Sequence, residues 1–574
     1  MASSTRPPGT PDESDPSGAS TPPPIPPAGW SSDDETADTL SWPAGAAAAG
    51  STGASAATPP PRRGAARRAP VIVVLAAAMA LLLGGSAFAF FTVDPFHLFR
   101  PGPQAAEGLP ADAILYAGMD LDPTASQKVD ALRFLNHFPA FRDSAGLTDE
   151  NADVRETLVS KLLESTGCSD LDYADDVRPW LGQRFGFALM PPTPSDARPY
   201  AVAVQVTDED RARDGIAALL ACGSTDGAAG NDATGVAFSN GYLLLAQTQA
   251  EADGYASAAD EHSLADDAEF DADVDSLGDA GVATMWVDVQ AAVRDWADGA
   301  DGAGPLADLK DLTSSSQRIA ATFRFGSDHV EIATSVFGDT PAIDHGDNPI
   351  VNLPDSTVFA LSESGGDQRV AQAWDRTIAR ARSESVDIDR EISDFEASSG
   401  LSLPADLETV LGHSLTIALD REGLTAQALG GGDPTAVNLG VRFTSDPDRL
   451  SDIYDTLLGI VGSGVDQTMP FVRKDVDDGL IMATNQAYAE KLASDDGTLG
   501  DSDAFRSVVD DGADKEFVLF LDMDAVKDQV LQSMRDGGAP ADLIANLEPL
   551  RSFGITAGVE GDYVNTTMRL SVTG

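Results

Sequence analysis

Apolar side chains recur with a period of two along several short stretches of the chain. Residues 201–206, 322–325 and 330–336 show this period, which is expected of strands with one buried face. Asn240–Gly241 separates two apolar runs, a pattern typical of a two-residue type I′ turn, and Gly326–Asp328 separates two more. The pattern therefore predicts antiparallel strands joined by hairpins.

Helical spacing appears between these runs. In residues 208–222, Ile216 and Leu219 recur at helical spacing behind a charged first turn. Residues 127–138 and 154–166 are also predicted to be helical. Helices that alternate with antiparallel hairpins predict an α+β fold in which the helices pack on the sheets.

The order of these segments repeats once along the chain. Four pairs of similar segments follow one another in the same order at nearly constant offsets. They are marked by Leu109 and Leu353, 244 positions apart, Trp180 and Val410, 230 apart, and Asp288 with Asp522 and Asp328 with Asp562, both 234 apart. Ordered self-similarity of this kind reports a duplication. We therefore predict two similar α+β halves, residues 101–347 and 348–574.

A long apolar segment precedes the two halves. Residues 71–91 read VIVVLAAAMALLLGGSAFAFF, without a charge, and are long enough to span a bilayer as a helix. Arginines crowd residues 62–68, whereas few basic residues follow the segment, so the positive-inside rule places the N-terminus in the cytoplasm. Seventy residues precede the segment, too many for a signal peptide. The pattern predicts an uncleaved signal anchor.

Residues 1–70 are rich in Pro, Ser, Thr, Ala and Gly and hold few aliphatic side chains. Such a segment buries too little apolar surface to offset its ordering entropy, so it is predicted to be a disordered cytoplasmic tail. The predicted fold class is therefore α+β, with tandemly duplicated halves of antiparallel sheet plus helices after one transmembrane helix and a disordered N-terminal tail. This places the protein in the cell membrane, with residues 101–574 outside the cytoplasm.

Charge narrows the range of partners. The chain has 92 acidic and 37 basic residues, a formal net charge of −55, and nearly all of the excess lies beyond residue 91. A field of this sign repels phosphate backbones, which excludes nucleic acid as a partner. Adaptation to a salty exterior and simple solvation of a surface domain both explain the acidity. Nothing else in the sequence signals halophily, which favours solvation.

Sequence motifs for catalysis or cofactor binding are missing. The six histidines form no i, i+4 pair, and the chain has no Gly-x-Ser-x-Gly, P-loop or dinucleotide-binding motif. Four aspartates between 271 and 279 have the spacing of the first calcium-loop ligands, but Ser276 and Val282 stand where that loop needs Gly and Glu. These aspartates are instead predicted to lie on a solvated helix face. The sequence therefore predicts no catalytic, cofactor-binding or metal-binding residue.

Cys168 and Cys222 are the chain's two cysteines, 54 positions apart. Outside the cytoplasm they can form a structural disulfide, which at this loop length contributes about 4 kcal/mol in the chain-entropy model. Two buried thiols remain the alternative. No Cys-x-x-Cys pattern points to redox catalysis.

Three segments carry a resemblance to a known family. They are LPADAILYAGMDLDP at residues 109–123, ALRFLNHFP at 131–139 and SLADDAEF at 263–270. Together they resemble an uncharacterised family of actinobacterial, membrane-anchored, extracytoplasmic proteins known as a domain of unknown function. The resemblance covers residues 90–574. It implies a location and a fold, but no activity.

These observations favour a non-catalytic binding or interaction module of the cell envelope. Its paired halves would form a cleft for a protein, glycan or lipid ligand, since pockets commonly lie between similar units. Two alternatives stay open. One is an envelope hydrolase or transferase whose acid pair comes from separate segments. The other is transmembrane signalling through the cytoplasmic tail.

Overall fold

The computed structural model describes residues 105–121, 125–144, 155–156, 159–160, 163, 168, 170–193, 199–223, 234–296, 316–340, 342–383, 387–425, 434–461, 471–494 and 496–573. All of them belong to the second of two units into which the chain divides, residues 68–574. The predicted tail at 1–70 and the predicted membrane helix at 71–91 lie outside the described residues.

The helices in the described ranges differ from the predicted anchor. None of them is both long and apolar enough to cross a membrane. The longest is α10 (Gly366–Ser383), which has 18 residues and carries arginines and aspartates along its length. The prediction of a single-pass transmembrane protein is therefore corrected, because the fold shown is α+β, built on an antiparallel sheet, with no such span in its described part.

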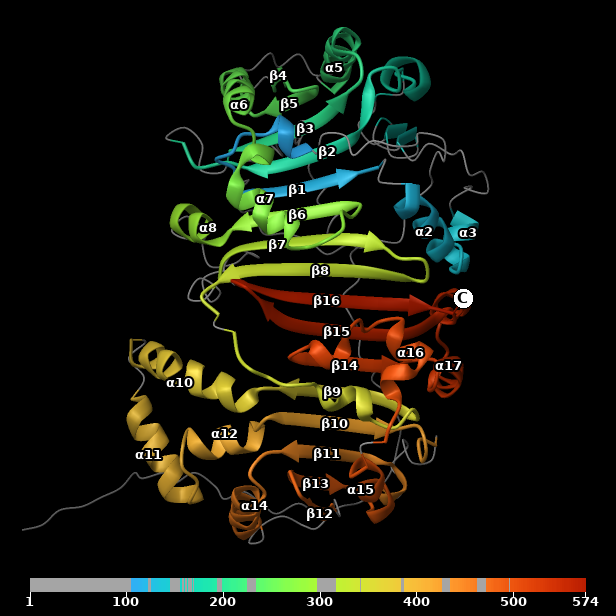
Figure 1. The fold of residues 1–574 in the computed structure, drawn as a ribbon. Helices are drawn as coiled ribbons and strands as arrows, with labels where there is room; N and C mark the ends of the chain where they lie inside the picture. The colour runs from blue at the N-terminus through green and yellow to red at the C-terminus, as the bar shows by residue number, and fades with distance from the viewer. Residues whose placement is uncertain are drawn as a thin grey trace, which may run out of the picture. The chain divides into compact units, whose positions relative to one another are not determined.

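The first eight strands form one side of the sheet (Figure 1). They are β1 (Leu115–Asp120), β2 (Leu181–Leu189), β3 (Tyr200–Val206), β4 (Gly235–Ser239), β5 (Tyr242–Ala246), β6 (Ala283–Asp288), β7 (Ser316–Phe325) and β8 (His329–Gly338). Their spatial order is β4-β5-β3-β2-β1-β6-β7-β8. Neighbouring strands of this half are antiparallel throughout.

The next eight strands continue the same sheet. They are β9 (Thr357–Ser364), β10 (Ser414–Asp420), β11 (Leu439–Thr444), β12 (Val472–Val476), β13 (Gly479–Ala483), β14 (Phe517–Asp522), β15 (Leu550–Glu560) and β16 (Tyr563–Val572). Their order is β12-β13-β11-β10-β9-β14-β15-β16, and β16 pairs antiparallel with β8. The described strands of both halves thus form one 16-stranded sheet with a seam between β8 and β16.

Strand order and register are the same on both sides of the seam. The pair Phe325 with Val330 in the β7–β8 hairpin has its counterpart in Val559 with Val564 of the β15–β16 hairpin, 234 positions later. At the seam, Ala333 lies opposite Thr567, and these two residues are also 234 apart. A half-turn about this point therefore relates the central strands of the two halves. The boundaries 101–347 and 348–574 stay a prediction.

Helices and short turns cover both faces of the sheet. In the first half they are η1 (Ala105–Gly108), α2 (Ala125–Leu135), α3 (Pro139–Ser144), η2 (Tyr173–Val177), α5 (Glu209–Gly223), α6 (Gln249–Glu261), η3 (Leu264–Asp266), α7 (Ala268–Asp275) and α8 (Val289–Trp296). In the second they are η4 (Pro349–Asn352), α10, α11 (Ile388–Ser399), α12 (Ala405–Leu411), η5 (Pro434–Ala436), α14 (Pro447–Val461), α15 (Gln486–Leu492), η6 (Leu499–Asp501), α16 (Asp503–Arg506), η7 (Gly512–Asp514), α17 (Lys527–Asp536) and α18 (Ala541–Leu547).

Two faces of the sheet differ in how completely they are buried. On the first face, which carries Ala320 and Ala360, the helices η1, α6 and α7 cover one half and α15 and α16 cover the other. On the second face, which carries Phe325, α5 covers the outer strands and α2 and α3 cover the strand ends near the seam. Strand residues near the seam are mostly buried on the first face and half-buried on the second.

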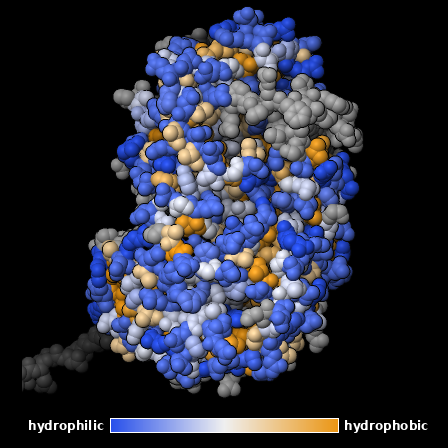
Figure 2. All heavy atoms as spheres, viewed as in Figure 1, coloured by the Kyte–Doolittle hydropathy of each residue, from blue (hydrophilic) through white to orange (hydrophobic). Residues whose placement is uncertain are grey.

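Several local predictions are confirmed. The β4–β5 hairpin turns at Asn240 and Gly241, both with positive φ, as the type I′ turn requires. The β7–β8 hairpin turns at 326–328, and α5 covers the helix predicted at 208–222. The visible surface is largely hydrophilic, as Figure 2 shows, in keeping with the strongly acidic composition.

Candidate functional site

A cleft of about 290 Å³ opens in the second half, beside the seam. It lies where the end of β9 and the first turn of α10 approach β14 and β15. We call it the Glu516 cleft. It is lined by Thr340, Glu363, Ser364, Arg369, Glu516, Phe517, Ala557, Gly558, Val559 and Val564. Its walls therefore combine three charged side chains with apolar strand residues, the composition expected of a small-ligand site.

Glu516 holds the centre of the cleft through both of its carboxylate oxygens. Oε2 forms an ion pair with Arg369, and Oε1 accepts a hydrogen bond from the Val559 backbone N–H at 3.2 Å. Burial lowers the pKa of the Arg369 guanidinium from its ordinary value, and the negative charge of Glu363 opposes this effect. The cleft thus contains a fixed ion pair and a second carboxylate.

The side-chain hydroxyl of Ser364 has no hydrogen bond among the described residues. Its side chain is 2% exposed, and its Oγ has no hydrogen-bond partner among the described residues. Its backbone N–H donates to the Glu516 carbonyl at 2.7 Å, which fixes the residue at the cleft wall. A buried hydroxyl left unpaired costs about 1–3 kcal/mol. The Ser364 Oγ is therefore an enclosed polar atom at the cleft wall.

The cleft exists because small side chains replace aromatic rings. In the first half, Phe323 and Phe325 pack edge to face at 5.1 Å, and Phe134 of α2 packs on Phe325 at 5.9 Å. In the second half, the register places Ala557 and Val559 at the equivalent positions, 234 residues later. Opposite Ala557, Phe517 stands where the first half has Ala283, so the net change is the loss of one ring. Protein interiors are densely packed, so this loss leaves space unless a helix moves in. The first copy is a filled core, and the second copy is hollow.

A charge has also replaced an apolar residue in the hollow copy. Glu516 stands 234 positions after Val282, which is 1% exposed and packs in the core beneath α2 and α3. Sequence analysis did not find this site. The signal was present in the repeat itself, because the same offset aligns Phe323 with Ala557 and Val282 with Glu516.

A buried polar cluster crosses the seam between β8 and β16. Glu331 of β8 accepts a hydrogen bond from Arg569 of β16 at 2.6 Å and also pairs with Arg324, and Arg569 pairs with Asp510. Burial opposes ionisation of Glu331, but the charges and hydrogen bonds of the two arginines outweigh it and lower the pKa of Glu331. This cluster joins the halves and is structural.

A second cluster ties the first half to β16. Asp273 of α7 accepts hydrogen bonds from Arg318 Nε at 2.7 Å, Trp286 Nε1 at 2.8 Å and the Tyr563 hydroxyl at 2.9 Å. Burial and the hydrogen bond to Asp273 raise the pKa of Tyr563 to about 12. Asp271, Asp275 and Asp279 are exposed, as predicted, but Asp273 is buried and serves as the acceptor of the cluster, so the prediction of a solvated position is corrected for Asp273.

Ser356, Asp420 and Lys491 form a third cluster, which could suggest a serine nucleophile. Lys491 Nζ donates to Ser356 Oγ at 2.8 Å and to Asp420 Oδ2 at 2.6 Å. A lysine that activates serine has to be neutral. Burial disfavours the ammonium, but the hydrogen bond and charge of Asp420 outweigh burial and raise the pKa of Lys491. Lys491 therefore stays protonated at neutral pH, and the cluster is an ion pair.

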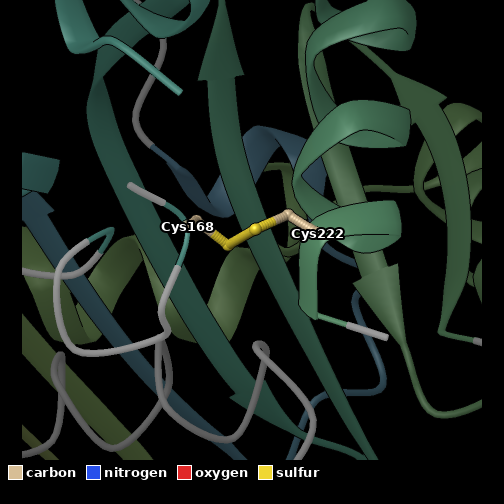
Figure 3. The surroundings of a disulfide bond; sticks show 2 residues. All are labelled: Cys168 and Cys222. Atoms are coloured by element: carbon tan, nitrogen blue, oxygen red, sulfur yellow. A yellow bond between two sulfur atoms is a disulfide. The ribbon is translucent and has the colours of Figure 1, made fainter. Parts of the chain in front are cut away.

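The two cysteines meet in the first half. Figure 3 shows a disulfide from Cys168 to Cys222, which lies at the end of α5, and the Cα atoms are 5.7 Å apart. The bond lies away from the Glu516 cleft in the sheet order, because α5 follows β3 on the outer side of the first half. Within the ranges that the structure describes, no group of three or more His, Cys, Asp or Glu side chains could hold a metal ion.

Comparison with known proteins gives one match. Residues 73–412, more than half of the chain, match the model of a family described as "Protein of unknown function (DUF3352)". No curated protein and no solved structure matches the chain. The resemblance to a family of unknown function is thereby confirmed. The match carries no information on source organism or on anchoring.

Proposed function

We propose that this chain, which belongs to this family of proteins of unknown function, is a non-catalytic binding module of the cell envelope. Its ligand enters the Glu516 cleft. One observation carries the proposal. The duplicated position is a packed core in the first half and a cleft with a buried, unpaired Ser364 hydroxyl in the second. A change that opens a core and lines it with polar groups costs stability, and a bound ligand would recover it.

Binding is favoured over acid–base catalysis by the state of the carboxylates. Glu363 and Glu516 line the same cleft, as a hydrolase would require. Both oxygens of Glu516, however, are engaged by Arg369 and the Val559 N–H. A carboxylate held in this way is an anchor for Arg369 and is poorly placed to exchange a proton with substrate. Transmembrane signalling would require a membrane span, and it is not part of this proposal.

An extracytoplasmic envelope location is part of the proposal. The Cys168–Cys222 disulfide supports it, because such bonds persist in oxidising compartments and are rare in the cytosol. The ligand is an envelope component, with nucleic acid excluded by the net charge of −55.

The test uses the full-length protein and extracts of the envelope of the producing cells, in one polar and one organic phase. After incubation, native mass spectrometry reads any retained small molecule. Wild type retains one. Ala557→Phe, which restores the ring that Phe323 supplies in the first half, loses it. Val441→Phe in β11 is the matched control and keeps it. Retention by Ala557→Phe, or no retained molecule from either phase, overturns the proposal.

A further inference from the structure

Strand pairing places four small residues in one line on the second face of the sheet. Each is the direct partner of the next across neighbouring antiparallel strands. From the cleft outward they are Ala557 of β15, Thr566 of β16, Thr334 of β8 and Ala321 of β7. Direct partners point to the same face, and strands are about 4.8 Å apart, so this small row runs about 14 Å from the cleft across the seam.

Larger apolar residues flank the small row on both sides. One flanking row contains Ile555, Met568, Ile332 and Phe323, and the other contains Val559, Val564, Val336 and Ile319. Each lies two residues along its strand from the small row, about 7 Å away. Ala557, Val559 and Val564 also line the Glu516 cleft, so the small row and one flanking row begin in the cleft.

The small row departs from the symmetry of the sheet. The 234-residue relation maps Ala557 onto Phe323 and Ala321 onto Ile555. The half-turn about the seam therefore exchanges the small row with the flanking row that carries the bulky side chains. At each of these positions, one half has a large side chain and the other half has a small one. This is the same divergence that opens the cleft.

Large apolar side chains on this face are exposed to solvent. Ile332 in a flanking row is 40% exposed, and Met285, the β6 partner of Ala321, is 45% exposed. Both side chains are therefore available to contact an apolar ligand on this face. Methionine is also a flexible side chain that adapts to apolar ligands.

We propose that the ligand is an amphiphile with one apolar chain, which lies along the small row, and an uncharged, hydroxyl-bearing head, which enters the Glu516 cleft. This inference rests on the proposed function and names its ligand class. The Glu363 carboxylate lines the cleft and provides an acceptor for head-group hydroxyls. The cleft holds one more acid than base, so it repels an anionic head.

Other occupants fit less well. An added peptide strand needs a free sheet edge, whereas β15, β16, β8 and β7 are paired on both sides. A second copy would bring together two chains that each carry a net charge of −55. A single apolar chain meets none of these obstacles.

The test is calorimetric titration of the full-length protein with three palmitoyl probes below their micelle concentrations. Monopalmitoylglycerol binds, palmitate binds at least tenfold more weakly, and palmitoyl lysophosphatidylcholine tests a zwitterionic head. Shortening the glycerol ester by four methylenes weakens binding about a hundredfold, because each buried methylene contributes to transfer from water. No binding of monopalmitoylglycerol, or affinity independent of chain length, overturns the inference.

Two substitutions separate this inference from the proposed function. Ala321→Phe blocks the small row two strands beyond the seam and weakens the glycerol ester at least tenfold, while Val441→Phe leaves its affinity unchanged. If Ala557→Phe abolishes ligand retention but Ala321→Phe does not alter the titration, the chain path is wrong and the cleft proposal stands. If Ala321→Phe weakens binding and Ala557→Phe does not, the cleft proposal fails. A concentration-dependent dimer that Ala321→Phe abolishes would assign the face to self-association, against the inference.

Discussion

Ala557 and Phe323 occupy the same position in two copies of one structure. Ala557 pairs with Phe517 in β14. Phe323 and Ala283, which lie 234 positions before these two residues, pair in the same way between β7 and β6. The bulk at this position decides whether a core or a cleft lies beside the seam. The difference between the copies is therefore testable by exchange.

Exchange of these two residues should have opposite effects on stability. Ala557→Phe fills space beside Val559 and is expected to raise the free energy of unfolding by about 1 kcal/mol, as cavity filling commonly does. Phe323→Ala opens the packed copy and is expected to lower it by about 3 kcal/mol. Urea unfolding of the full-length protein measures both. Equal losses in both variants would contradict the account of the cleft.

Two serines on β9 offer a matched pair. The buried Ser362 Oγ lies 2.8 Å from Thr416 Oγ1, whereas Ser364 Oγ has no partner among the described residues. Ser362→Ala leaves a buried hydroxyl unpaired and is expected to lower the free energy of unfolding by about 1–2 kcal/mol. Ser364→Ala removes an unsatisfied group, and stability should stay within about 0.5 kcal/mol. Thermal unfolding distinguishes them, and a comparable loss in Ser364→Ala argues against an unpaired hydroxyl.

The stability of the seam should depend on the negative charge of Glu331. Glu331→Gln removes the negative charge that Arg324 and Arg569 share and replaces one of its two acceptor oxygens with an amide donor, which is expected to lower the free energy of unfolding by about 3 kcal/mol. Asp503→Asn removes an exposed partner of Arg506 and serves as the control, with an effect below about 0.5 kcal/mol. Denaturant titration compares them. Equal small effects would show that the seam does not rest on this cluster.

The same carboxylate makes stability depend on pH. Its pKa lies below the ordinary 4.5, because the two arginines outweigh burial. The unfolded chain then binds the proton more readily than the folded one, so the contribution is complete above about pH 4.5 and is lost as pH falls toward the folded pKa. The difference in unfolding free energy between wild type and Glu331→Gln should shrink over this range. A difference constant down to pH 3 contradicts the shift.

The disulfide should be intact in protein purified without reductant. Alkylation after denaturation is expected to find no free thiol, because Cys168 and Cys222 are bonded. The double variant Cys168→Ala/Cys222→Ala should lose about 4 kcal/mol of stability, since the bond closes a loop with a sequence separation of 54. Two alkylated cysteines per chain would instead support the buried thiols.

The local structure of this protein could be predicted from its sequence better than the assembly of its sheet. The turn at Asn240–Gly241 follows from backbone chemistry that acts over two residues. The continuous sheet does not, because the pairing of Ala333 with Thr567 joins residues far apart in sequence with no local signal. The anchor predicted at 71–91 rested on composition, and the described part of the fold contains no membrane span.

The site escaped prediction for a related reason. Motif searches look for reactive groups, whereas the Glu516 cleft arises from smaller side chains at two core positions and from one charge at a third. The register confirms that Glu516 and Val282 are equivalent, and the fold brings Ser364 beside Glu516. Comparing the copies by size and charge, residue by residue, would have indicated the place.

The most direct measurement is backbone hydrogen exchange of the full-length protein with and without the ligand retained from envelope extract, because each half serves as a control for the other. The account predicts slower exchange at residues 363–369 and 559–564 on binding, and no change at residues 325–330, the first-half equivalents of 559–564. Protection at 325–330, or equal protection in both halves, would contradict the claim that the second copy has become the binding site.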